Sequence, residues 1–225
     1  MLPTPDRRET LRYLHIRPDA VTPEMTAALD RCDRALLQAA RPRTVWRLFA
    51  LTPEGTLAGT DFTPEGSDIR RHLDGCESVV LLAATLGSEA ERLIRRAGQT
   101  DMGEAVMLDA AASAAIEAVC DALCRDLAAA LAPRHLTARY SPGYGDFPLA
   151  QQETLCRVLD LPRRIGVTLS PGGLLLPQKT VTALIGVSDR PIPNRNRPGC
   201  FTCPGRDTCL YRKEGAACER NSDPA

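Results

Sequence analysis

The feature that most constrains the fold is the stretch from Asp101 to Leu131, which reads as one long helix. Residues that recur every three or four positions share a single helix face, and all of them except Glu117 are small or apolar: Val106, Ala110, Ser113, Glu117, Cys120, Cys124, Leu127 and Leu131. The run from Ala110 to Ala115 contains only alanine and serine. Such a helix can approach a flat surface closely, and we expect that surface to be a β-sheet. Pro133 ends the helix.

Other segments mix helix and strand patterns without regular alternation, which favours an α+β fold. Thr22, Pro23 and Glu24 indicate a helix start, and this helix runs to about Ala40. The continuous apolar run from Ser78 to Leu86 predicts a strand covered on both faces. Further predicted elements are strands at 43–51, 166–170 and 180–188, a strand or hairpin arm at 56–60, and helices at 69–73, at 149–159 and after a Ser88 cap.

Composition and charge exclude several classes of protein. Basic and acidic residues cancel, 28 against 28, without a basic stripe, so we expect no nucleic-acid partner. No stretch approaches the ~18 apolar residues of a membrane span. The N-terminus carries no apolar segment of a signal peptide. Nine cysteines without an export signal indicate a reducing compartment, and we expect the cytoplasm.

The composition changes after Ser188 to proline, asparagine, arginine and cysteine. We therefore predict a main domain at 1–188 and a linker with a Cys-rich tail at 189–225. Four tail cysteines have a spacing that suits either zinc or an iron–sulfur cluster, with unliganded thiols as the alternative: Cys200, Cys203, Cys209 and Cys218. The other cysteines are scattered, and we interpret them as small buried hydrophobes: Cys32, Cys76, Cys120, Cys124 and Cys156.

The segment from Arg139 to Leu149 combines a fixed cation, aromatic hydroxyls, a Pro-Gly corner and an acid that we expect to be buried, Asp146. Pro142 followed by Gly143 predicts a type II turn whose backbone groups can face a small polar ligand. Arg139 can hold a carboxylate through two parallel hydrogen bonds. A loop pinned by proline, with the arginine on the surface, is the alternative.

The order Arg139-Tyr140-Ser141-Pro142-Gly143-Tyr144 resembles the Arg-x-x-x-Gly-Tyr signature of the S-adenosylmethionine-binding activation domain of cobalamin-dependent methionine synthase. It is most similar to the small stand-alone relatives of that domain. Colinear segments at 11–14, 74–76, 84–87, 108–117, 148–152, 166–169 and 177–183 resemble the same family. The resemblance implies that family's fold, a mixed or antiparallel sheet packed with helices.

The resemblance also implies roles for individual residues. Arg139 would hold the ligand's carboxylate, and Glu117 would face its sulfonium or amino group, although a structural ion pair with Arg139 or a surface position is the alternative for this acid. Ser141 and Gly143 would offer backbone groups to the adenosine, and Tyr144 would reach toward the reaction centre. Two more binding residues are assigned by position alone, and an exposed strand start is equally consistent with them: Lys179 and Thr180. No side chain is expected to act as an acid or base.

The chain departs from the family at two places. Ser113 stands where some relatives carry a second acid, with Asp109 a further turn back. Leu184 and Ile185 stand where the large enzyme has an aromatic residue. The first departure leaves a role for two carboxylates open. Because of the second, stacking at that strand is either lost or supplied by another part of the protein.

The chain contains no Asp-x-His-x-x-Gly motif of the kind that holds cobalamin. The resemblance therefore implies that cobalamin belongs to a separate partner, a corrinoid methyltransferase such as a methionine synthase lacking its own activation domain. Its inactive Co(II) would be reduced to Co(I) by a donor such as a flavodoxin or ferredoxin and then methylated by S-adenosylmethionine. The alternatives are a sensor of S-adenosylmethionine and an iron–sulfur electron-transfer or docking protein.

Overall fold

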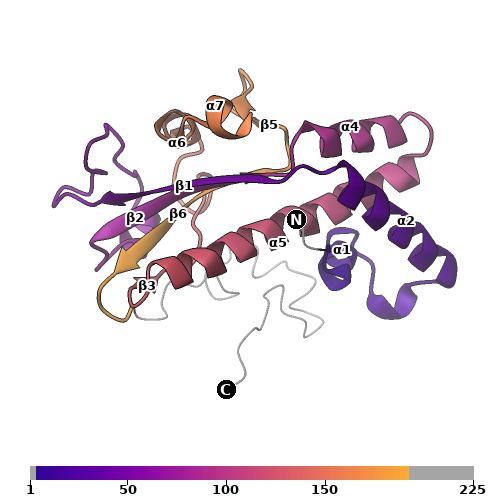
Figure 1. The fold of residues 1–225 in the computed structure, drawn as a ribbon, viewed down its shortest axis with the longest axis horizontal. Helices are drawn as coiled ribbons and strands as arrows, with labels where there is room; N and C mark the ends of the chain where they lie inside the picture. The colour runs from indigo at the N-terminus through magenta and orange to yellow at the C-terminus, as the bar shows by residue number, and fades with distance from the viewer. Residues whose placement is uncertain (1–3, 193–225) are drawn as a thin grey trace.

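The computed structural model describes residues 4–192, and their centre is a four-stranded antiparallel sheet in the order β1-β2-β6-β3 (Figure 1). Its strands are β1 (Arg43–Ala50), β2 (Ser78–Thr85), β6 (Thr180–Ser188) and β3 (His135–Leu136). The two inner strands pair along their whole length, with Leu82 opposite Ala183. Both inner strands are almost entirely buried, as a continuous apolar run predicts.

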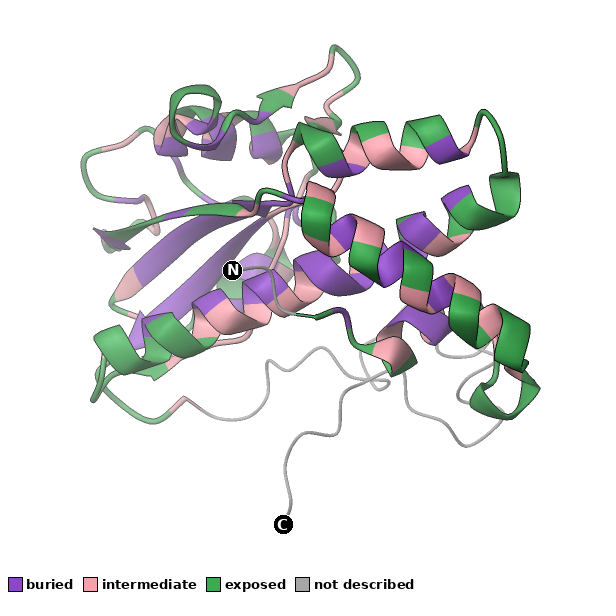
Figure 2. Cartoon of the chain, turned by 45° about the vertical axis from the view of Figure 1, so that its right-hand side comes forward, coloured by how far each residue is buried: buried purple, intermediate pink, exposed green. Residues whose placement is uncertain are grey.

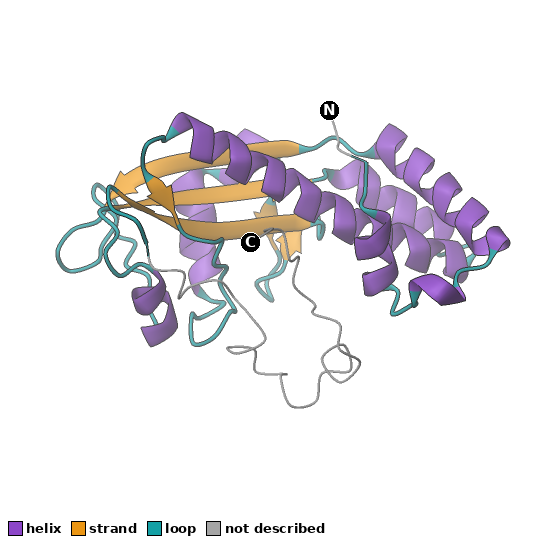
Figure 3. Cartoon of the chain, turned by 90° about the horizontal axis from the view of Figure 1, so that it is seen from below, coloured by secondary structure: helices purple, strands orange, loops and turns teal. Residues whose placement is uncertain are grey.

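The helix α5 (Met102–Ala130) crosses one face of the sheet (Figures 1 and 3). Its C-terminal half contacts the sheet, because Leu123 and Leu127 pack on β2 and β6. The alanine run lies further toward the N-terminus of α5, where it packs on the end of β2 and on neighbouring helices. These helices are α1 (Arg7–Tyr13), α2 (Pro23–Ala39) and α4 (Ser88–Ala97), and a 3-10 helix, η1 (Pro18–Ala20), joins the first two.

The opposite face of the sheet is covered by shorter elements (Figure 1). Phe62 and Phe147 are the largest side chains buried there. The covering elements are α3 (Ser67–His72), α6 (Gln151–Leu159), α7 (Leu161–Ile165) and the small hairpin β4 (Thr168–Leu169) and β5 (Leu175–Leu176). The protein therefore has the α+β architecture that its pattern predicts, with buried residues on both sides of the sheet (Figure 2).

Local signals placed several helix starts correctly. Asp101 accepts a hydrogen bond from the amide of Glu104 at 3.1 Å and caps α5, and the Thr22 hydroxyl caps α2 in the same way. The Ser88 cap is wrong, because α4 begins at Ser88 and its cap position is Gly87. Gly87 has φ of +82°, which a side-chain-bearing residue seldom adopts.

Other predictions were wrong. The arm predicted at 56–60 forms only an isolated bridge between Leu51 and Leu57. On α5 the face most deeply buried contains Leu108, Ala112 and Ile116, so the predicted stripe runs along the edge of that face, and Val106 is 52% exposed. Alanine fits a buried or an exposed position equally well. An alanine-rich period therefore cannot decide which neighbour points inward.

Candidate functional site

The segment Ser141 to Tyr144 forms the predicted type II turn. The amide of Tyr144 donates to the carbonyl of Ser141 at 3.1 Å, and Gly143 has the required positive φ of +92°. The amide of Gly143 donates to the carbonyl of Phe147 at 2.8 Å. The expectation that these backbone groups stay free is therefore wrong for the Ser141 carbonyl and the Gly143 amide, which the loop uses to hold its own shape.

Asp146 anchors this loop to the start of α3. Its carboxylate accepts hydrogen bonds from the amide of Ser67 at 2.7 Å, the hydroxyl of Ser67 at 2.5 Å and the amide of Asp68 at 2.9 Å. These bonds, the serine hydroxyl first, lower the pKa of Asp146 to about 2. Asp146 is exposed, so the prediction of a buried acid is wrong. It caps a helix that lies far away in sequence and has no cap of its own.

The other end of α3 is tied to the chain just before the turn. Nε2 of the buried His72 lies 2.9 Å from the carbonyl oxygen of Ala138 and 2.8 Å from the hydroxyl of Thr137. The His72 ring lies 4.8 Å from the ring of Tyr140, centroid to centroid. Burial lowers the pKa of His72, so the ring is neutral at physiological pH. The helix α3 therefore contacts both ends of the segment from Arg139 to Leu149, which we call the signature loop.

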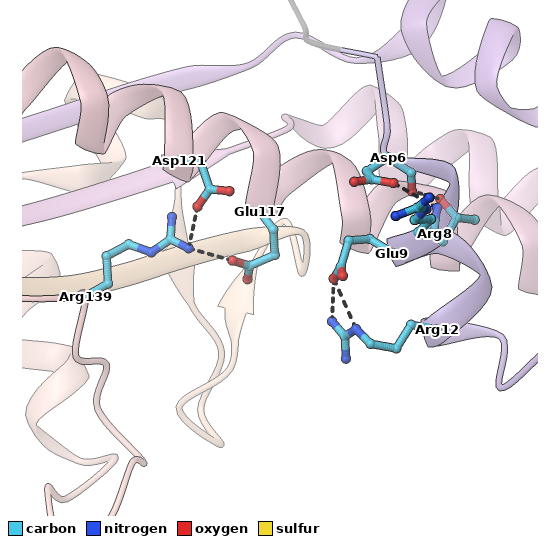
Figure 4. Close-up of polar contacts among 8 residues, drawn as sticks. Asp6, Arg8, Glu9, Arg12, Glu117, Asp121 and Arg139 are labelled. Atoms are coloured by element: carbon cyan, nitrogen blue, oxygen red, sulfur yellow. Dashed lines mark hydrogen bonds and ion pairs between the residues drawn. The ribbon is translucent and has the colours of Figure 1, made fainter. Parts of the chain in front are cut away.

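Arg139 lies between two carboxylates of α5 (Figure 4). Its Nη2 is 2.8 Å from Oε2 of Glu117 and 3.0 Å from Oδ1 of Asp121. The side chain of Arg139 is only 20% exposed, and its Nη1 is shielded from solvent and has no hydrogen-bond partner among residues 4–192. A guanidinium that uses one terminal nitrogen for these ion pairs can donate hydrogen bonds from the other to a further anion.

The structure brings three of the sequence-predicted residues together here. Tyr144 remains 54% exposed, yet burial and the nearby Glu117 carboxylate raise the pKa of its hydroxyl, with Arg139 opposing. Asp121 belongs to the same cluster, and sequence reasoning missed it. The available signal was its spacing of four residues from Glu117, which places two side chains on one face of a helix.

Lys179 and Thr180 lie at the start of β6. The Nζ of Lys179 is 2.9 Å from Oδ1 of Asp109 and 2.8 Å from Oγ of Ser113, and its side chain is 15% exposed. The exposed alternative is therefore wrong for Lys179. The Thr180 hydroxyl donates to Thr85 at 2.8 Å and to the carbonyl of Pro177 at 2.7 Å. Polar groups thus follow α5 from Asp109 to Asp121, with a cation bound at each end of the row.

A hollow of about 340 Å³ lies beside this row, between α1, α4 and α5. That volume is near the lower end of small-ligand pockets. Asp109 and Ser113, the two residues that contact Lys179, also line this hollow. Its lining is mostly apolar: Tyr13, Leu14, Ile94, Met102, Ala105, Val106, Asp109, Ala110 and Ser113. A second hollow of about 450 Å³ is lined by parts of 149–153 and 169–173.

The described residues contain no group of three or more His, Cys, Asp or Glu side chains that could hold a metal ion. Burial raises the pKa of Cys120 to about 12 and raises that of Cys124 against the effect of Arg139, so both thiols are protonated at neutral pH, as expected of small buried side chains. Cys32, Cys120 and Cys156 are buried, as predicted. The predicted ligands lie outside the described residues: Cys200, Cys203, Cys209 and Cys218.

The comparison with solved structures gives the same architecture. The chain has the fold of the MetH reactivation domain. One similar solved structure is the crystal structure of that domain bound to AdoHcy, with a TM-score of 0.56 over 91% of this chain and 76% of the other. Sequence identity is 16%, so the likeness establishes the fold. No protein-family profile and no curated protein matches the chain. Within residues 4–192, no helix has the length and apolarity to cross a membrane.

Proposed function

We propose that the chain binds S-adenosylmethionine at Arg139 and supports reductive reactivation of a separate corrinoid methyltransferase. The observation that carries the proposal is the partly buried Arg139 between Glu117 and Asp121, whose Nη1 has no hydrogen-bond partner within the part of the chain that the structure describes. The shared fold with a reactivation domain supports the same assignment. The partner would be a methionine synthase lacking its own activation domain.

The charges of the cluster match those of the ligand. S-adenosylmethionine carries a carboxylate, an ammonium and a sulfonium. In the proposed complex Nη1 of Arg139 donates to the carboxylate, which satisfies a buried donor that otherwise lacks a partner. The two acids of α5 lie where they can offset the ligand's positive charges. A buried or half-buried charge is stable only when it is paired, and the ligand supplies the pairing.

The remaining proposed contacts surround this cluster. Tyr144 lies beside Glu117 and keeps half of its surface open toward an incoming methyl acceptor. Ser141 and Gly143 contribute the shape of the turn, and backbone groups not used inside the loop would meet the adenosine. Lys179 and Thr180 would contribute by fixing neighbouring residues. Lys179 bonds Ser113 at the edge of the hollow beside α5, and Thr180 bonds Thr85 where β6 begins.

The reaction needs placement more than acid–base chemistry. Cobalamin on the partner supplies a strong nucleophile after one-electron reduction by a flavodoxin- or ferredoxin-type donor. Methyl transfer then breaks the bond between carbon and sulfur, and the electron pair of that bond stays on sulfur as a neutral thioether. No proton moves, so the residues of this chain bind the donor and aim its methyl group. No described residue is proposed as an acid or base.

The rest of the proposal concerns organisation. We propose the division into a main domain at 1–188 and a tail at 189–225, with the tail cysteines holding an iron–sulfur cluster or zinc. A cluster would allow the tail to deliver electrons, whereas zinc would not. We also propose a cytoplasmic location. The absorption spectrum of anaerobically purified protein distinguishes the two metals, because only the cluster absorbs visible light.

Calorimetric titration tests the binding site. Arg139→Ala is expected to weaken S-adenosylmethionine binding by about 1.5–3 kcal/mol, at least tenfold, because it removes a charge-assisted contact. The matched control is Arg157→Ala on α6, which removes an exposed ion pair between Arg157 and Asp61 and should leave affinity unchanged. Equal affinity of both variants would exclude Arg139 from the site.

A reconstituted assay tests the activity. The protein is mixed with a reductant, S-adenosylmethionine and a Co(II) corrinoid protein, and the absorption spectrum is followed toward methylcobalamin. We expect methylcobalamin to form only when this protein is present, and not to form with the Arg139→Ala variant. If S-adenosylmethionine binds but no corrinoid protein of the same organism is methylated, the protein is a sensor and the reactivation function is refuted.

A further inference from the structure

The outer edge of β1 exposes a row of backbone amides and carbonyls. β1 is an edge strand of the main sheet (Figure 1). Its antiparallel register with β2, together with the bond from the Leu51 amide to the carbonyl of Glu77, turns every second residue of β1 toward β2. Thr44, Trp46 and Leu48 are the residues in between, so their amides and carbonyls point away from the sheet. None of these groups has a backbone hydrogen bond within residues 4–192.

This edge is longer than the opposite edge of the same sheet. Within the described part of the chain, the open row ends at Ala50, whose carbonyl accepts a hydrogen bond from the amide of Ala58 at 2.9 Å. The opposite edge strand, β3, has two residues, whereas β1 has eight. Very short edge strands keep a sheet from adding strands, and a long open edge is a template for one. β1 can therefore accept a further strand.

Two apolar side chains flank the open row on the face of the sheet that α5 crosses. Trp46 and Leu48 lie opposite Leu82 and Val80 of β2, which belong to the cluster under α5. The helix packs on β2 and β6, and Trp46 and Leu48 remain 39% and 37% exposed. Tryptophan is among the residues that contribute most of the binding energy in protein interfaces. This side of the edge therefore suits apolar side chains of a partner.

Positive charge flanks the open row on the other face. Side chains of a strand alternate, so the exposed Arg43 and Arg47 lie on the face that α6 and α7 cover. Neither of them pairs with a carboxylate within residues 4–192, and one acid of α7's start, Asp160, approaches an arginine of that helix at 3.9 Å. Two exposed arginines lie on α7, which packs on β1: Arg163 and Arg164. This side of the edge therefore suits acidic side chains.

We propose that the outer edge of β1 binds an extended acidic segment of a partner protein as an added antiparallel strand. Main-chain hydrogen bonds to Thr44, Trp46 and Leu48 would hold the segment, and its side chains would give the specificity. Successive side chains of a strand point to opposite faces, so the fitting segment alternates apolar residues with acidic ones. The apolar residues lie beside Trp46, and the acids lie beside Arg43 and Arg47. This interaction is independent of S-adenosylmethionine binding.

Charge also decides against two other occupants of the edge. A second copy of the chain, paired through its own β1, would bring the arginines of both copies onto one face, and like charges across strands are destabilising. The segment 193–225 contains more basic than acidic residues. An acidic segment is attracted by the same arginines that repel these two.

The first test measures binding of synthetic peptides to the full chain by fluorescence anisotropy. The probe is fluorescein-labelled Val-Glu-Val-Glu-Val-Glu-Val, and the charge control is the same peptide with lysine in place of glutamate. We expect the glutamate peptide to bind about tenfold more tightly or better, because its charges are opposite to those of Arg43 and Arg47. Equal affinities, or no binding of either peptide, would overturn the inference.

The second test asks whether the peptide binds as a strand. Opposite residues of an antiparallel pair have side chains on the same face, so the valines beside Trp46 also direct their amides to β1. N-methylation of the valines should therefore weaken binding about tenfold or more, whereas N-methylation of the glutamates should leave it nearly unchanged. Equal effects of the two modifications would overturn strand addition. The comparison uses the unaltered protein, so it is decisive even if a substitution impairs folding.

The third test locates the surface. Replacing both Arg43 and Arg47 by alanine should weaken binding of the glutamate peptide about tenfold. The matched control replaces Arg31 and Arg34, two exposed arginines of α2, by alanine and should leave the affinity unchanged. Equal losses in the two double variants would show general attraction of an acidic peptide to arginine and would overturn the inference.

Discussion

A single methyl group at Gly145 tests whether α3 holds the signature loop in place. Gly145 has φ of +52°, and a Cβ built there would overlap Oδ2 of Asp68 and lie 2.7 Å from the hydroxyl oxygen of Tyr140. The left-handed backbone costs alanine about 1–2 kcal/mol. Displacing packed neighbours costs about 1–3 kcal/mol more. Gly145→Ala should therefore lower the free energy of unfolding by about 2–5 kcal/mol.

The control is Gly59→Ala, because Gly59 also has positive φ, +76°, but nothing lies within 4 Å of a Cβ there. This variant should lose only the backbone part, about 1–2 kcal/mol. The unfolding free energies of both variants are measured by urea unfolding, from the midpoint and the slope of the transition. Adding Asp68→Ala to Gly145→Ala removes the nearest obstructing atom and should recover part of the loss. Equal losses for the two glycines would refute the contact between the loop and α3.

Two further predictions concern the same framework. The pKa of Asp146 is lowered from 3.8 to about 2 in the folded protein, so its stabilising effect is complete above the unfolded value and disappears as pH falls through about 2. The difference in urea midpoint between wild type and Asp146→Asn should thus shrink between about pH 4 and pH 2, and a constant difference would contradict the cap. On β6, a Cβ at Gly186 would lie 2.5 Å from Sγ of Cys76. Gly186→Ala should cost about 1–3 kcal/mol in unfolding free energy, and adding Cys76→Ala should restore most of it. No restoration would mean that another neighbour sets the cost.

Local rules predicted the parts of the fold that depend on local chemistry. The strand from Thr180 to Ser188 was found with its observed bounds, because a run of Val, Thr and Ile leaves few alternatives. The type II turn followed from Pro142 and Gly143 for the same reason. The strands β3 and β5 were missed, because two residues are too few to show a period. The helix α7 was missed as well, with five residues.

The candidate site divides in the same way. Its cation and its turn could be predicted from the signature around Arg139, together with an acid at Glu117. Asp121 could not be assigned, because its role depends on the rotation of α5 against the strand that precedes the loop. The alanine-rich period left that rotation open. Asp146 was predicted to be buried, because nothing in its neighbourhood shows that the start of α3 lies beside it.

The sequence by itself determined most of the longer helices and strands, the turn after Pro142, and which charged groups lie near that turn. These properties depend on residues a few positions apart, whose geometry follows from backbone sterics and hydrogen bonding. Only the tertiary structure decided which charges meet. Arg139 lies between Glu117 and Asp121, and Asp146 caps α3, because packing of α5 and α3 around the sheet joins segments separated by 22 and 79 residues. Partners at such separations are selected by burial of the whole core, which no local pattern encodes.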